Sequence, residues 1–203
     1  EFALKRVVAA GLPRIYEIGP CYRERESGPW HGREFLMLEW YRVGASLDDL
    51  MDEVESLVET CALGLGVAPP VQWTRTTVRE LYRDRLGVDL AKASAHDLSS
   101  GRDQAWDDAF FRRWVEDIEP SLSKPTFIRD WPATQAALAQ IRTDQDWPTA
   151  QRFEVFLQGI ELANAFFELT DGQEQRRRFI EANLERQAAG ESPHPMDENF
   201  IAA

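Results

Sequence analysis

Two short strand-like runs joined by a polar turn constrain the fold of this chain more than any other feature. Apolar residues recur along residues 14–23 and 34–43, and residues 27–32 supply a turn that contains two glycines. Such a pair predicts an antiparallel hairpin. An arginine, an aromatic ring and several carboxylates lie on these runs or in the turn, so a single hairpin would carry all of them.

These side chains are the types that a nucleotide site needs. Arg23 carries a planar guanidinium that can bind a phosphate through two hydrogen bonds, and Glu26 can accept a hydrogen bond from an adenine amino group. Phe35 offers a flat face to a purine, and His31 in the turn can reach outer phosphates. Each residue alone has an ordinary alternative, as a surface ion pair, a core ring or a solvated loop residue. The combination favours a nucleotide site.

The rest of the chain predicts an α+β domain with antiparallel strands and flanking helices. Its 203 residues, 43% of them hydrophobic, suffice for a substantial core. Residues 87–102 have the weakest pattern and are expected to form an insertion or a mobile connection. Helices are predicted over residues 47–65, from a cap at Thr76 or Thr77 to residue 86, over 103–116, and from Thr170 or Asp171 to 189. Strands are predicted over residues 126–131, 152–158 and 161–169, the last two paired around Gly159.

Composition limits the partners and the setting of the protein. The formal charge of −12, from 35 acidic and 23 basic residues, disfavours a polyanion such as tRNA. No apolar run approaches the length of a membrane span, and no leader is recognised. Cys21 and Cys61 have neither zinc-site spacing nor the density of a disulfide-rich secreted domain, which predicts a reduced, cytoplasmic setting.

Three separated blocks of sequence carry a resemblance to a known family. The set Arg23, Glu26, His31, Glu34, Phe35, Glu39 and Tyr41 resembles motif 2 of class II aminoacyl-tRNA synthetases, and LKRVVAAGLPRIYEIG at 4–19 narrows it to the lysine branch. KPTFIRDWPATQAALAQI at 124–141 and GIELANAFFELTD at 159–171 are similar to lysyl-tRNA synthetases and to their paralogue, the elongation factor P lysine ligase. LEWYR at 38–42, ATQAALAQI and SPHPMDEN at 192–199 favour the ligase. Departures from the family pattern are Glu24, Arg25, Gly32, Ala165 and Phe167.

The resemblance implies an ATP-dependent ligase that forms a lysyl or (R)-β-lysyl adenylate and transfers the acyl group to a lysine of elongation factor P. It implies ATP contacts from Arg23, the catalytic arginine, and from Glu26, His31, Phe35, Glu161 and Leu162. Glu154 and Glu161 correspond to magnesium carboxylates, which is apt for a hard cation on phosphates. The implied amino-acid pocket comprises Glu1, Glu39, Tyr41, Asn164, Phe166 and Glu168. Glu154 has a plain alternative as an outward-facing strand residue.

Two other functions stay open at this point. A lysyl-tRNA synthetase catalytic domain would share the adenylate chemistry, and a non-catalytic paralogue would bind nucleotide without turnover. The 203 residues match the family as a partial catalytic domain in which motif 1, the source of the usual homodimer, and motif 3 are not recognised. The ligase is the leading hypothesis because its distinguishing stretches are present.

Overall fold

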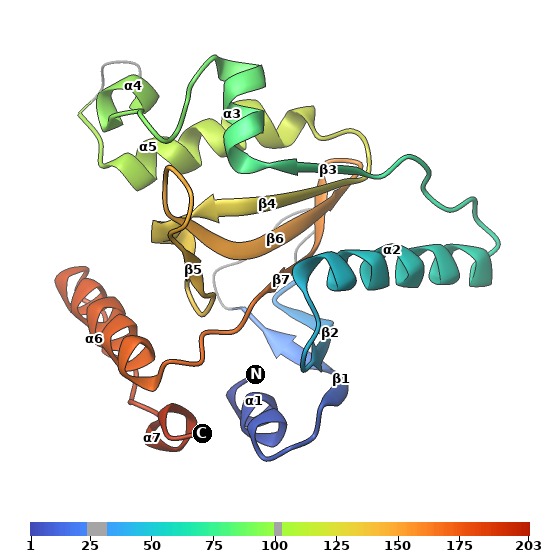
Figure 1. Ribbon diagram of the computed structural model, residues 1–203, viewed down its shortest axis with the longest axis horizontal. Helices are drawn as coiled ribbons and strands as arrows, with labels where there is room; N and C mark the ends of the chain where they lie inside the picture. Colours follow the sequence, from blue (N-terminus) through green and yellow to red (C-terminus); the bar gives the residue numbers. More distant parts are fainter. Residues whose placement is uncertain (24–31, 100–102) are drawn as a thin grey trace. The chain divides into compact units, whose positions relative to one another are not determined.

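The computed structural model describes residues 1–23, 32–99 and 103–203 (Figure 1). The chain divides into two compact units, residues 1–45 with 171–203, and residues 46–170. Among the helices described, none is both long enough and apolar enough to cross a bilayer.

The first unit contains the predicted hairpin. Strand β1 (Arg14–Tyr22) pairs antiparallel with β2 (Glu34–Arg42) in one unbroken register, from Arg14 opposite Arg42 to Tyr22 opposite Glu34. Because side chains alternate between the faces of a strand, this register separates the two faces chemically. The hairpin prediction is confirmed.

Three helices complete the first unit around a small aromatic cluster. They are α1 (Phe2–Ala9), α6 (Gly172–Ala188) and α7 (Glu198–Ile201). The rings of Phe2 and Phe200 stack with centroids 4.4 Å apart, and Phe179 lies 5.7 Å from Phe2. The carboxylate of Asp171 caps α6, as predicted, and a Cβ on Gly172 would lie 2.8 Å from the carbonyl oxygen of Ile201. Glycine at this position therefore allows α7 to approach the start of α6.

The second unit is built on a five-stranded sheet. Its strands are β3 (Thr74–Thr77), β4 (Thr126–Pro132), β5 (Ile141–Arg142), β6 (Thr149–Leu157) and β7 (Ile160–Phe166). The order is β3-β4-β6-β5, and β7 also pairs with β6. Strand β3 was not predicted and runs parallel to β4, so the sheet is mixed rather than wholly antiparallel. The predicted turn between β6 and β7 is present, with Gln158 and Gly159 both at positive φ.

Helices cover one face of this sheet. Figure 1 shows α3 (Val78–Leu86), α4 (Ala95–Ser99) and α5 (Trp106–Arg113) gathered on one side of β3, β4 and β6. A π-helical turn (Trp114–Ile118) continues α5, so the helical segment both begins and ends later than the predicted helix over residues 103–116. Helix α2 (Leu47–Gly64) contacts β6 and β7. Capping boxes begin α2 and α3, with Thr77 as the α3 cap.

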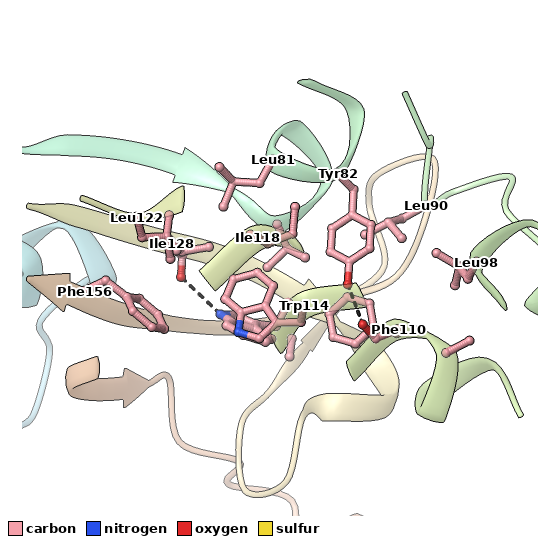
Figure 2. Packing of buried hydrophobic residues seen from close by; sticks show 14 of the residues in the cluster. Leu81, Tyr82, Leu90, Leu98, Phe110, Trp114, Ile118, Leu122, Ile128 and Phe156 are labelled. Atoms are coloured by element: carbon pink, nitrogen blue, oxygen red, sulfur yellow. Dashed lines mark hydrogen bonds between the residues drawn. The ribbon is translucent and has the colours of Figure 1, made fainter. Parts of the chain in front are cut away.

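An aromatic core joins the helices to the sheet. Phe110 is fully buried and stacks on Tyr82, whose hydroxyl donates to the Phe110 carbonyl at 2.7 Å (Figure 2). Ile128 and Phe156 reach the same cluster from β4 and β6. Within residues 87–99, expected to be irregular, the structure has α4 and two buried core residues, Leu90 and Leu98. Both belong to the core cluster that also contains residues of α3 and α5, and such long-range packing is not visible in the local sequence pattern.

Candidate functional site

One face of the hairpin collects four of the predicted site residues. Phe35, Glu39 and Tyr41 alternate along β2 and therefore share a face. Arg23 follows β1, and its guanidinium carbon lies 5.2 Å from the centroid of the Phe35 ring. The backbone N–H of Arg23 donates to the carbonyl of Arg33 at 2.9 Å, which holds the strand end in place. Glu26 and His31 lie outside the described residues.

The opposite face of the hairpin is apolar in its middle and charged at its ends, where Arg14 lies opposite Arg42 and Glu34 lies opposite Tyr22. Tyr16 and Ile18 on β1 lie opposite Trp40 and Leu38 on β2. Strand alternation therefore places Phe35, Glu39 and Tyr41 together and away from this apolar stretch. A one-residue slip in register would mix the two sets, so the register specifies the site.

Glu17 is a residue of this face that the sequence analysis missed. It lies directly opposite Glu39, and its side chain leans over Gly19, where an added Cβ would be 3.7 Å from the Glu17 carboxyl carbon. Like charges that face each other across strands destabilise a sheet, and a bound cation would relieve the repulsion. Counting outward from the turn in both strands would have revealed the pair.

Glu1, the predicted contact for the substrate amino group, is engaged within its own helix. Its carboxylate lies 2.8 Å from the ammonium nitrogen of Lys5, one turn along α1. The Lys5 side chain is buried, whereas that of Glu1 is 42% exposed. The carboxylate is thus available at the helix start but already has a cationic neighbour.

The second cluster lies on the five-stranded sheet. Register places Glu154 opposite Asn164, and Phe166 opposite Arg152, so these four side chains share one face. The register shifts between Val155 and Phe156, which puts Glu161 opposite Phe156 and on the face of Glu154. Strict alternation from Asn164 would have put Glu161 on the other face. Leu162 falls within this irregular stretch and is 48% exposed.

Glu154 is buried, so its reading as an outward-facing strand residue is wrong. It is 8% exposed and lies opposite the core residue Ile128 on the face covered by helices. Burial, reinforced by the negative charge of Glu161, raises the pKa of Glu154 to about 8, although Arg152 opposes the shift. A cation between the two carboxylates would favour their charged forms.

The donor set is compatible with magnesium on a nucleotide. Among the described residues, no group of three or more His, Cys, Asp or Glu side chains is arranged to hold a metal. Magnesium commonly takes one or two carboxylates and completes its shell with phosphate oxygens and water. Glu154 and Glu161 match that pattern, whereas they would be too few for a closed structural metal site.

Glu168 lies just beyond β7, in a segment that backbone hydrogen bonds hold against residues 138–140. An isolated bridge pairs Glu168 with Ala139, and the side-chain amide of Gln140 donates to the Glu168 carbonyl at 3.0 Å. Three predicted residues of the amino-acid pocket, Asn164, Phe166 and Glu168, therefore follow one another along a single ordered strand and its extension.

Comparison with known proteins identifies the family of the chain. Residues 1–203 match the family described as tRNA synthetases class II (D, K and N). The chain is 41% identical over 211 aligned positions to proteins named elongation factor P (R)-β-lysine ligase from Hamiltonella defensa and Proteus mirabilis, and 40% identical to that of Pectobacterium atrosepticum. Each alignment covers all of this chain and 64% of the relative's length. The chain therefore belongs to the class II aminoacyl-tRNA synthetase family of the D, K and N type.

Proposed function

We propose that the complete protein activates lysine or (R)-β-lysine with ATP and transfers the acyl group to a lysine of elongation factor P. The observation that supports this proposal is the polar hairpin face, on which Arg23, the Phe35 ring and the side chains of Glu39 and Tyr41 lie together. The relatives to which the chain is 40–41% identical are named as ligases of elongation factor P, which supports elongation factor P as the acceptor. The family supplies ATP as the activating nucleotide.

In the first half-reaction, a carboxylate oxygen of the amino acid attacks the α-phosphorus of ATP, and the bond to pyrophosphate breaks. The nucleophile is already an anion, so the protein acts mainly by positioning and by neutralising charge. Arg23 would bind the α-phosphate, with Phe35 against the purine. Glu26, His31 and Leu162 are proposed as further ATP contacts on the resemblance alone.

The substrate's distal ammonium needs negative charge if it is to leave water. Glu39 and Glu168 would provide that charge, with Tyr41 as a hydroxyl partner. Phe166 would line the aliphatic stem of the substrate. Asn164 would bind its carboxylate, and Glu1 its amino group next to the reacting end.

When bound, magnesium would screen the charge of the phosphates, and Glu154 and Glu161 are the residues that would hold it. In the second half-reaction, a lysine amine of the acceptor attacks the acyl carbon, AMP leaves, and the amine loses a proton. We also propose that the complete protein is a cytoplasmic homodimer; Cys21 and Cys61 of this chain are free thiols, which agrees with a reducing compartment.

Mass spectrometry can test this function directly. The complete protein would be incubated with ATP, either (R)-β-lysine or α-lysine, and both elongation factor P and tRNA. We expect one lysyl-type mass on a single lysine of elongation factor P, and negligible acylation of tRNA. Efficient tRNA charging without protein modification would instead favour a lysyl-tRNA synthetase, and binding of ATP without any acylation would favour a non-catalytic paralogue.

A further inference from the structure

Arg152 is held by three contacts of different kinds. Its Nη2 donates to Oε1 of Glu154 at 2.5 Å, and its Nη1 donates to the carbonyl oxygen of Gln135 at 3.0 Å. The guanidinium carbon lies 4.9 Å from the centroid of the Trp131 ring. The Arg152 side chain is 19% exposed and that of Glu154 only 10%. A planar fork can stack and donate in two directions at once, which a lysine ammonium cannot do.

The groups that hold Arg152 are themselves anchored. The side chains of Gln135 and Thr134 both donate to Oδ1 of Asp107 on α5, at 2.8 and 2.6 Å. The indole N–H of Trp131 donates to the carbonyl of Ile128 at 3.1 Å. Part of the ligase-like ATQAALAQI stretch therefore connects α5 to Arg152.

An irregularity in the sheet brings Trp131 to this position. The register between β4 and β6 shifts between Arg129 and Trp131, and Asp130 has a φ of +57°. Trp131 consequently lies opposite Ala150, on the face that carries Arg152 and Glu154. Regular alternation from Ile128 would have pointed Trp131 to the other face. A strained backbone residue that persists beside a candidate site indicates that the surrounding structure requires it.

We propose that Arg152 is a positioning residue, which fixes the carboxylate of Glu154 so that its remaining lone pairs face a magnesium ion on the nucleotide. The inference rests on the proposed function, because it takes Glu154 as one of the two magnesium carboxylates. An ionised carboxylate accepts from several directions, so it can serve the guanidinium and a cation together. Hydrogen bonds to a metal-binding carboxylate orient it, and their loss weakens metal binding by about 10-fold to 100-fold.

The test measures metal binding without relying on turnover. Mn²⁺, as a paramagnetic substitute for Mg²⁺, would be titrated by electron paramagnetic resonance into the complete protein with a non-hydrolysable ATP analogue. Arg152→Met should weaken Mn²⁺ binding by about 10-fold to 100-fold and leave lysine affinity unchanged. Arg152→Lys should retain most of that defect, because the charge remains but the three contacts cannot all form. It also provides the test if Arg152→Met does not fold.

Arg79→Met is the matched control. Arg79 has an 18% exposed side chain and is paired with Asp89 and Asp146, and neither of these ion pairs involves Glu154. Its replacement should leave Mn²⁺ affinity unchanged. A comparable loss of Mn²⁺ binding in Arg79→Met would show that any lost ion pair disturbs the site, and would overturn the specific role of Arg152.

A double-variant cycle separates this inference from the proposed function. If Arg152 acts through Glu154, then Arg152→Met should add little Mn²⁺ defect to a Glu154→Gln protein. Wild-type Mn²⁺ affinity in Arg152→Met, with a clear loss in Glu154→Gln, would overturn the positioning role alone. Wild-type affinity in Glu154→Gln would overturn both the role and the magnesium assignment. Elongation factor P acylation, assayed in the wild-type protein, tests the proposed function separately.

Discussion

Replacing Arg23 with alanine should separate catalysis from stability. Arg23 is exposed, and its described ring contact is with Phe35, at 5.2 Å from the guanidinium carbon to the centroid. An exposed cation–π contact contributes about 0.5–1 kcal/mol, so loss of the Phe35 contact should lower the free energy of unfolding by about that amount. Loss of a preorganised charge on the α-phosphate should instead cost about 3 kcal/mol in the transition state, which is roughly 150-fold in rate.

Amino-acid-dependent exchange of pyrophosphate into ATP measures this loss in the complete protein. Arg23→Lys should recover only part of the rate, because an ammonium cannot bind phosphate through a planar fork. Arg14→Ala is the matched control, since Arg14 is exposed at the far end of the same hairpin, opposite Arg42. Near-normal exchange in a folded Arg23→Ala protein would remove Arg23 from the site and refute the assignment of the polar hairpin face.

Three further outcomes are expected. Glu39→Gln or Glu168→Gln should weaken the binding of lysine-like substrates and preserve ATP binding in calorimetry, and unchanged affinity in both would rule out the ammonium pocket. Phe110→Ala should lower the free energy of unfolding by about 3–5 kcal/mol in denaturant titration; a loss under about 1 kcal/mol would contradict its central place in the core. Hydrogen bonds from Arg79 lower the pKa of Asp89 from 3.8 to about 2, so their stabilisation should be present above pH 4 and vanish towards pH 2. Unfolding measured across that range should depend less on pH in Arg79→Met, and an unchanged pH profile would show that this pair contributes nothing.

Local patterns predicted the elements that depend only on neighbouring residues. The β1–β2 hairpin was placed within one residue of its observed ends because its apolar alternation and polar turn are both local signals. Each of the two caps was predicted as one of two neighbouring residues, of which the structure has Thr77 and Asp171, since a side chain that accepts from the next turn needs no distant partner. Strand β3 was missed because four polar residues become a strand only through β4, which lies about fifty residues later.

The sequence by itself determined the family, the hairpin and the candidate charged residues, because these follow from residue type and from short-range periodicity. The tertiary structure decided which of those residues meet. Two register shifts, one on each side of β6, bring Trp131 and Glu161 to the face of Glu154, where alternation would have pointed both away. The contact of Arg152 with Glu154 likewise depends on Trp131 and Gln135 arriving from β4 and its following turn. Such an arrangement is set by pairing and packing between distant segments, and a one-residue change in register exchanges the two faces of a strand.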